Sequence, residues 1–151
     1  MTLRSILLAT DGSKSAQKAL ELATDLARAN NARLLILNVQ RPENAGSLPP
    51  ELAEFALVEN VRFTERDLYS EVAGRIVRDA EKRARELGAQ DVDAVTTEGD
   101  PARSIVETAK SRKVDAIVIG SHGLGDFESL LLGSVSHKVA HLAPCTCIIV
   151  R

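Results

Sequence analysis

The residues of this sequence whose types and spacing best suggest chemistry are glycines and serines near the C-terminus. Gly120 and Gly123 are followed, after nine intervening residues, by the pair Gly133-Ser134. Glycines let a backbone approach an anion closely. The unpaired N–H groups at a helix start then bind that anion, helped by the positive end of the helix dipole. The pattern predicts a phosphate-binding cradle, and with it a nucleotide ligand.

Two common phosphate-binding motifs do not fit this pattern. The dinucleotide fingerprint belongs in the first strand-to-helix turn, where this chain has only Asp11-Gly12-Ser13. A P-loop needs Gly-Lys followed by Ser or Thr, and the sequence contains no such run. The spaced glycines therefore indicate a different class of phosphate site.

A protein-built metal site is the weaker interpretation of the C-terminal histidines and cysteines. His137 and His141 are four residues apart, but the residues between them lack the glutamate of a zinc-protease helix, and two ligands do not complete a site. Cys145 and Cys147 alternate with Ile149 on one face of an expected strand, so we interpret them as small core residues. We expect no metal ligands from the protein.

Strands and helices that alternate along the chain must position these residues. Apolar segments predict strands at Leu3–Ala9, Leu34–Val39, Val114–Ile119 and Thr146–Val150, and weak alternation predicts a less buried strand at Asp91–Thr97. Residues 40–50 contain Pro and Gly and predict a loop, and residues 51–88 are expected to be mainly helical, with a break near Asn60. The inner stripe of that helical region is predicted to contain Leu68, Val72, Ile76, Ala80 and Leu87. Other helices are expected after Ser13, at Asp100-Pro101 and around Val135.

This order predicts a single α/β domain over residues 1–151, an open parallel five-stranded sheet with helices on both faces. The first and fourth strands are among the most apolar, so both belong inside the sheet, and the order 3-2-1-4-5 places them there. Ligands of such sheets bind where the strand order reverses, beyond the carboxyl ends of the strands. Asp11 and Gly120, which follow strands one and four, should face the same crevice.

Composition excludes several classes of protein. The 151 residues are 44% hydrophobic and carry a formal net charge of -2, which suits one domain with a full core and argues against nucleic-acid binding. No apolar run approaches the length needed to cross a bilayer, and Ile6–Ala9 is too short for the core of a signal peptide. We expect a cytoplasmic protein with no membrane or nucleic-acid partner.

The spaced glycines resemble the ATP-binding signature of the universal stress protein family, in its ATP-binding branch. The opening run Ile6–Ser13, the segment Gly99–Ala102 and the closing Leu131–Ser136 with Ala143–Cys145 are also similar to that family. The resemblance covers essentially the whole chain. It implies a Rossmann-like fold of the adenine nucleotide alpha hydrolase type.

The resemblance also implies a ligand and its site. The ligand would be ATP, with Mg²⁺ or Mn²⁺ held mainly by the phosphates. Asp11 would lie near the ribose and phosphates, Val39 beside the adenine, and the glycine–serine segment around the phosphates. The implied binding residues are Thr10, Asp11, Val39, Ile119, Gly120, His122, Gly123, Gly133, Ser134, Val135 and Ser136.

Individual site residues also have simpler interpretations. Asp11 alone would suit a cap of the first helix, His122 an ordinary loop histidine, and Gly133 close helix packing. Ser13, Ser134 and Ser136 would likewise serve as caps or exposed hydroxyls. Asp126 and Glu128 lie between the glycines where family members often carry basic or neutral residues, and their charge would oppose triphosphate binding.

Three hypotheses about function follow. The leading one is an ATP-binding stress-response regulator, because the sequence offers no nucleophile with an evident base partner. Its rival is an enzyme, an ATPase or an adenylate-forming relative, that uses the same crevice. The third is a structural dimer with a vestigial pocket. The resemblance further suggests a homodimer paired through the last strand, Thr146–Val150.

Overall fold

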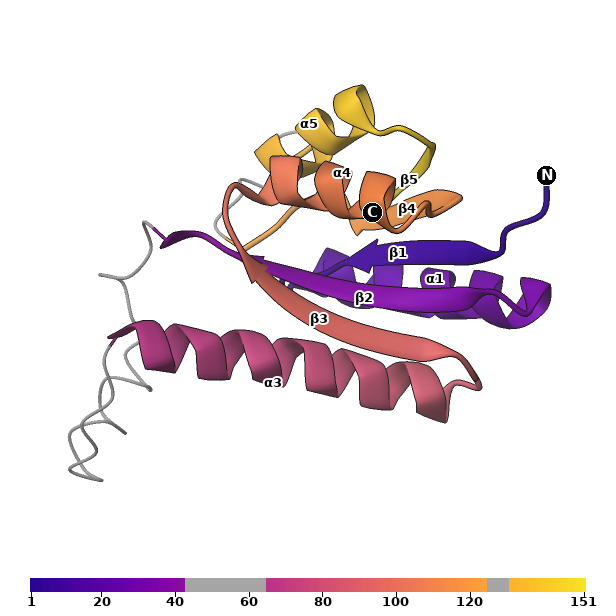
Figure 1. Ribbon diagram of the computed structural model, residues 1–151, viewed down its shortest axis with the longest axis horizontal. Coiled ribbons are helices and arrows are strands. Elements are labelled where there is room, and N and C mark those ends of the chain that lie inside the picture. Colours follow the sequence, from indigo (N-terminus) through magenta and orange to yellow (C-terminus); the bar gives the residue numbers. More distant parts are fainter. Residues whose placement is uncertain (43–64, 125–130) are drawn as a thin grey trace.

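A computed structural model describes residues 1–42, 65–124 and 131–151 of the chain. Strands and helices alternate through these residues (Figure 1). Their bounds are β1 Ser5–Ala9, α1 Lys14–Asn30, β2 Arg33–Gln40, α3 Glu65–Glu86, β3 Val92–Glu98, α4 Pro101–Ser111, β4 Ala116–Gly120, α5 Ser134–Leu142 and β5 Thr146–Val150.

The sheet has the predicted topology. All four strand pairs are parallel, and the order across the sheet is β3-β2-β1-β4-β5. Leu8 of β1 lies between Ile36 of β2 and Val118 of β4, so β2 and β4 flank the first strand. The fold class and strand order expected from the sequence are confirmed, and the switch point lies between β1 and β4.

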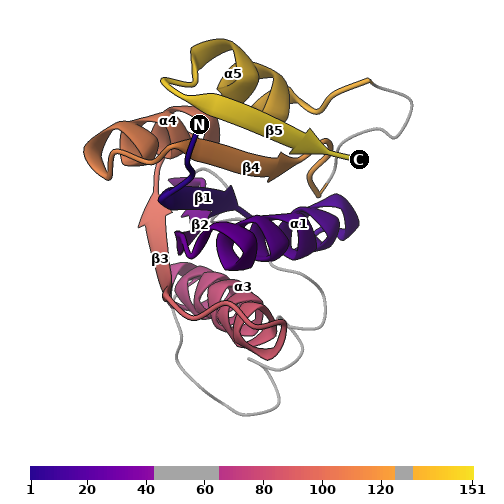
Figure 2. The same ribbon diagram turned by 90° about the vertical axis from the view of Figure 1, so that its right-hand side faces the viewer.

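Two helices cover each face of the sheet (Figures 1 and 2). Residues of α1 and α3 form one core with side chains such as Ile6, Leu34 and Val118. Residues of α4, joined by Val139 of α5, form the other core with side chains such as Leu7 and Ile117. Alternate residues of one strand thus enter opposite cores, which is why β1, β2 and β4 are almost continuously apolar.

Side-chain caps fix where two of the helices begin. The hydroxyl of Ser13 accepts a hydrogen bond from the amide of Ala16 at the start of α1. The carboxylate of Asp100 accepts one from the amide of Arg103, and Pro101 occupies the first turn of α4. Both starts agree with the sequence prediction.

Helix α3 differs from prediction in which face it buries. Leu68 and Ala80 of the predicted stripe are buried, but Val72, Ile76 and Leu87 are only partly buried. A strict spacing of four residues drifts about 40° around a helix at each step. The observed stripe keeps the helical period and consists of Leu68, Ala73, Val77, Ala80 and Ala84. The predicted break near Asn60, with residues 43–64, lies outside the described residues.

The last strand occupies one edge of the sheet. β5 pairs only with β4 among the described strands, and its residues Cys147 to Val150 are partly buried. Cys145, Cys147 and Ile149 pack against the α4–α5 core, so the predicted face for the cysteines is confirmed. Burial raises the pKa of both cysteine thiols, and both are free.

Candidate functional site

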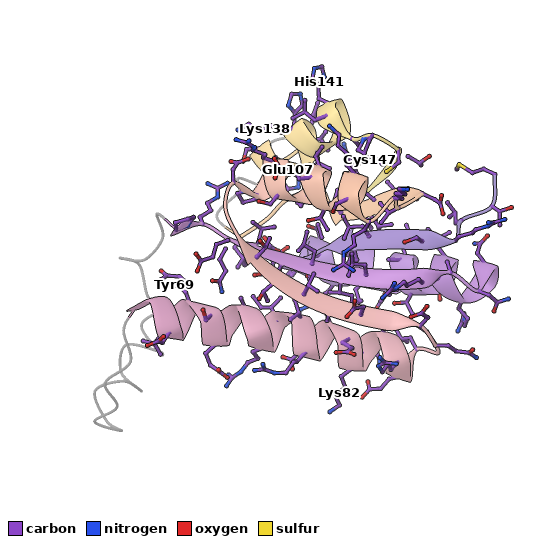
Figure 3. The ribbon with its side chains drawn as sticks, viewed as in Figure 1. Tyr69, Lys82, Glu107, Lys138, His141 and Cys147 are labelled. Atoms are coloured by element: carbon purple, nitrogen blue, oxygen red, sulfur yellow. The ribbon has the colours of Figure 1, made fainter. Side chains whose placement is uncertain are left out.

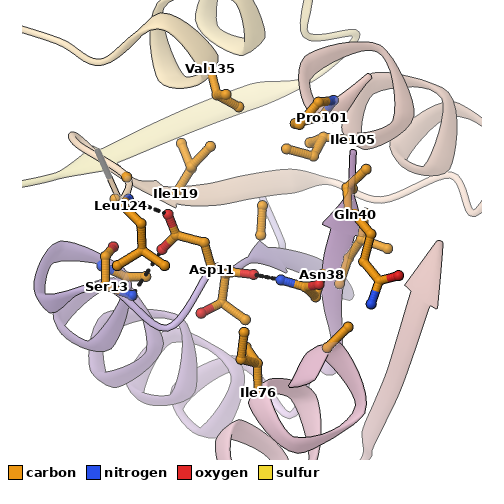
Figure 4. Close-up of a pocket in the computed structure, with 18 of the residues that line it drawn as sticks. Asp11, Ser13, Asn38, Gln40, Ile76, Pro101, Ile105, Ile119, Leu124 and Val135 are labelled. Carbon is orange, nitrogen blue, oxygen red and sulfur yellow. Dashed lines mark hydrogen bonds between the residues drawn. The ribbon is translucent and has the colours of Figure 1, made fainter. Parts of the chain in front are cut away.

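A cavity of about 470 Å³ opens at the carboxyl ends of the central strands, where the topology places a ligand (Figure 4). Ten of the eleven residues that the sequence implied line it, and they come from β2, β4, α5, the turn after β1 and the loop after β4. The exception is Gly133, which is the N-cap residue of α5. Two segments about 110 residues apart in the chain therefore meet at one cavity, as predicted.

Asp11 connects the turn after β1 to the loop after β4. One carboxylate oxygen accepts a hydrogen bond from the amide of Ser13 (2.9 Å) and the other from the amide of Leu124 (2.9 Å; Figure 4). Because Ser13 is the N-cap of α1, the simpler interpretation of Asp11 as that cap is wrong. Asp11 instead presents an acidic, hydrogen-bonding group to the cavity.

Gly120 is required by the packing of α1 against β4. A Cβ atom on Gly120 would lie 2.5 Å from the hydroxyl oxygen of Ser15 and 2.8 Å from the backbone nitrogen of Ala16. The hydroxyls of Ser13 and Ser15 in turn donate hydrogen bonds to the carbonyl of His122. The first turn of α1 therefore holds the start of the loop after β4, and helix packing is sufficient to require a glycine at position 120.

His122 lines the cavity beside the predicted phosphate segment. Its Nδ1 lies 3.0 Å from the hydroxyl of Ser121, a side chain that is only 2% exposed. Its backbone amide donates a hydrogen bond to the hydroxyl oxygen of Ser15 (3.3 Å). These contacts fix the imidazole at the edge of the cavity, so it is more than an unconstrained loop histidine.

The start of α5 has no side-chain cap, unlike the starts of α1 and α4. Its N-cap is Gly133, whose amide donates to the carbonyl of Ser121 (2.6 Å). Among the residues that the structure describes, no hydrogen-bond partner is found for the amides of Ser134 and Val135, which line the cavity. Such first-turn amides, with the helix dipole behind them, favour an anion.

The hydroxyl of Ser136 makes hydrogen bonds within the protein. Its oxygen lies 2.8 Å from the carbonyl of Ser121 and 3.1 Å from the carbonyl of Gly133, and the residue is 3% exposed. A serine hydroxyl has a single proton to donate. Because that proton is used within the protein, the backbone amide of Ser136 is the group left to serve an anion in the cavity.

Sequence reasoning missed the polar end of β2. Asn38 lines the cavity, is 5% exposed, and donates its side-chain amide to the carbonyl of Thr10 (2.8 Å; Figure 4). Gln40 and Arg41 follow it in the lining. A polar asparagine within an otherwise apolar strand was an available signal, since a buried amide needs partners.

Sequence reasoning also missed two helical walls. Pro101 and Ile105 of α4 line the cavity on one face of the sheet. Tyr69, Val72 and Ile76 of α3 line it on the other face. No sequence motif marks these residues, because their place depends on how each helix is rotated against the sheet.

A metal centre built by the protein is not found in the described part of the chain. No group of three or more His, Cys, Asp or Glu side chains gathers there in a way that could hold an ion. His137 and His141 are exposed on α5, which supports an ordinary helical face. Asp126 and Glu128, expected to weaken triphosphate binding, lie outside the described residues. None of the described helices is both long and apolar enough to cross a membrane.

Known proteins are similar in sequence and fold over the whole length of the chain. Universal stress protein YxiE of Bacillus subtilis is 36% identical over 147 residues, which cover 97% of each chain. The structure of UspA from Lactobacillus plantarum is similar at a TM-score of 0.80, with 26% identity over 100% of this chain and 99% of that one. A universal stress protein solved in complex with cAMP has a TM-score of 0.70 and 30% identity over 100% of this chain and 98% of that one. Residues 2–151 match the model of the universal stress protein family, and the chain belongs to that family.

Proposed function

We propose that this protein binds an adenine nucleotide, with ATP as the preferred ligand, and acts as a cytoplasmic, nucleotide-dependent regulator of the stress response. The observation that carries the proposal is the uncapped start of α5 at the wall of a cavity. A relative of similar fold and 30% identity has been solved with cAMP, and this supports an adenine nucleotide as the ligand class.

The phosphates belong at the start of α5. The amides of Ser134 and Val135 line the cavity, and Gly133 contributes no side chain that would cap them. A helix start of this kind attracts negative charge through its dipole and its unpaired N–H groups. Arg41 adds a positive side chain elsewhere in the lining.

The volume and lining of the cavity suit a nucleotide. About 470 Å³ falls within the range of roughly 300–1,000 Å³ found for small-molecule sites. Apolar side chains such as Val39, Ile105 and Ile76 can cover a base, while Asn38 and Asp11 offer polar groups. The divalent ion is proposed to bind through the phosphate oxygens, as Mg²⁺ commonly does.

Ser134→Asp tests the phosphate site with opposite effects on stability and binding. A carboxylate in the first turn of α5 should stabilise the helix by about 0.3–1 kcal/mol. At about 5 Å from a phosphate, the same charge would repel it by roughly 3 kcal/mol for an effective dielectric constant of about 20. We therefore expect calorimetry with magnesium-ATP to show at least a tenfold weaker Kd, while the apo protein melts no lower than wild type.

Ser111→Asp is the matched control, because it introduces the same charge at the exposed C-terminal end of α4. It should leave the Kd for ATP unchanged. For the wild type, ATP at 100 times its Kd should stabilise the fold by about 2.7 kcal/mol. If millimolar magnesium-ATP fails to raise the melting temperature and no nucleotide is released when the purified protein is denatured, the proposed function is wrong.

Whether the bound ATP is hydrolysed separates a regulator from an enzyme. Tight binding alone does not lower a reaction barrier, and His122 is the cavity side chain best placed to assist hydrolysis. For a regulator we expect negligible single-turnover hydrolysis in the wild type and in His122→Ala. Hydrolysis that His122→Ala abolishes while ATP binding is kept would favour the enzyme.

We also propose a homodimer that pairs through the edge strand β5. Ile148, Ile149 and Val150 are apolar and only partly buried in an edge strand that pairs, among the described strands, with β4 alone. Ile148→Lys should dissociate the dimer in light scattering at micromolar concentration. A wild-type monomer at that concentration would contradict the proposal.

A further inference from the structure

Helix α3 turns one apolar face toward the cavity instead of toward the core. Tyr69, Val72 and Ile76 are spaced i, i+3 and i+7, which places them on one side of the helix. All three line the cavity, are partly buried, and belong to neither of the two core clusters. We call these three residues the α3 wall.

The α3 wall is attached to the rest of the site at two points. The side-chain amide of Gln40, at the end of β2, donates a hydrogen bond to the carbonyl of Tyr69. Ile76 packs over the turn after β1, where its Cγ1 is 3.6 Å from the position a Cβ on Gly12 would take. These contacts hold the wall in place relative to Asp11 and the strand ends, so it is a fixed surface of the cavity.

The α3 wall lies across the cavity from the proposed phosphate site. α3 and α5 cover opposite faces of the sheet. Figure 4 shows Ile76 and Val135 on opposite sides of Asp11. A nucleotide whose phosphates bind at the start of α5 would therefore extend past Asp11 toward the wall.

Tyr69 lies near the N-terminal end of α3 (Figure 3) and gives the cavity lining a flat aromatic side chain. Within the described residues it is the only Phe, Tyr or Trp, and the whole sequence has one Tyr and no Trp. Aromatic rings bind nucleobases by stacking, a contact that does not require an edge-specific hydrogen bond. The chemistry of the wall is therefore that of a base-binding surface.

We propose that the α3 wall binds the base of the nucleotide, with the ring of Tyr69 stacked on it, and that this contact selects purines over the smaller pyrimidines. The inference rests on the proposed function, since it assigns the far end of the same ligand. It adds a specificity-determining surface that belongs to neither the glycine–serine segment nor the strand ends.

The experiment compares three ligands on the intact protein: ATP, CTP and inorganic tripolyphosphate, each with Mg²⁺. Calorimetry would measure their Kd values for the wild type, Tyr69→Ala and Tyr69→Phe. Loss of base stacking should weaken ATP binding about 5- to 150-fold in Tyr69→Ala, while Tyr69→Phe keeps a ring and stays close to wild type. Tripolyphosphate has no base, so its Kd should not change, and the preference for ATP over CTP should fall in Tyr69→Ala.

The fluorescence of the single tyrosine supplies a second readout. In the wild type, the emission of Tyr69 should change as ATP is added, saturate with the Kd from calorimetry, and stay constant when tripolyphosphate is added. Leu26→Ala is the control variant, because Leu26 is a partly buried apolar residue that packs on the core away from the cavity. Its Kd for ATP should equal that of the wild type.

Two kinds of result would overturn the inference, and they are distinguishable. If ATP binds but Tyr69→Ala keeps the wild-type Kd and the emission does not respond, the base lies elsewhere and the proposed function still stands. The inference also fails if Tyr69→Ala weakens tripolyphosphate and ATP equally, since the residue would then be structural. If no nucleotide binds the wild type, both the inference and the proposed function are wrong.

Discussion

Adding one methyl group at Gly120 should destabilise the protein, because the space for it is already filled. The new Cβ would lie 2.5 Å from the hydroxyl oxygen of Ser15, 2.7 Å from its carbonyl carbon and 2.8 Å from the nitrogen of Ala16. Two of these are backbone atoms of α1, so a change of side-chain rotamer cannot relieve the clash. Either α1 or the end of β4 must move.

The expected cost of Gly120→Ala follows from overpacking in a well-packed region, about 1–3 kcal/mol. The upper part of that range is expected here, since the neighbours are helix backbone and the strand lies in the middle of the sheet. For a domain of this size, a loss of 2 kcal/mol lowers the melting temperature by about 4–8 °C. Urea unfolding of the apo protein measures the free energy directly.

Gly74→Ala is the matched control, the same substitution with the opposite expected sign. Gly74 lies inside α3, and its new Cβ would meet the end of the Arg78 side chain at 2.8 Å, a flexible group that can move aside. Replacing a glycine in the interior of a helix by alanine stabilises the fold by about 0.5–1 kcal/mol. Equal stability of Gly120→Ala and wild type, with no ligand present, would refute the reasoning that α1 packing fixes this glycine.

Further predictions concern acid stability, thiol reactivity and the buried amide of the site. Amides of Arg4 and Ser5 donate hydrogen bonds to Asp115 and hold the pKa of its carboxyl below the ordinary 3.8. The stabilisation is therefore complete above about pH 3.8 and is lost as the pH falls through the lower folded pKa, so acid titrations of Asp115→Asn should lack that loss. Because burial raises the pKa of the Cys145 and Cys147 thiols, native protein at pH 7.5 should react with iodoacetamide more slowly than urea-unfolded protein, as mass spectrometry would show. Asn38→Ala removes the donor to the carbonyl of Thr10 and should cost about 1–3 kcal/mol in urea unfolding.

The sequence allowed the sheet to be predicted because strands buried on both faces carry long apolar runs. β1, β2 and β4 have this character, and burial at the middle of a sheet leaves few other orders. The convergence of Asp11 and Gly120 followed from topology alone. These features depend on composition along short segments, which is the information that a single sequence contains.

The walls of the cavity could not be predicted in the same way. Val72 and Ile76 are apolar at helical spacing, and such a pattern does not say whether the residue faces a core or a cavity. The answer depended on the rotation of α3, in which Ala80 and Ala84 face the core against the sheet. Gly120 illustrates a different limit: it lines the cavity as predicted, but its close packing against the first turn of α1 could not be predicted from the sequence.

The electrostatics of the cavity determine which way round a nucleotide can bind. Asp11 is acidic, and a phosphate placed against it would be repelled by several kcal/mol in a partly buried site. Ribose hydroxyls can instead donate hydrogen bonds to its carboxylate, which already accepts two from backbone amides. In the proposed complex the phosphates therefore bind at the start of α5, where the dipole favours them, and the base lies on the remaining side of Asp11. The charge of Asp11 and the apolar face of α3 therefore favour the same orientation of the nucleotide, with its base against α3. The two arguments rest on different residues.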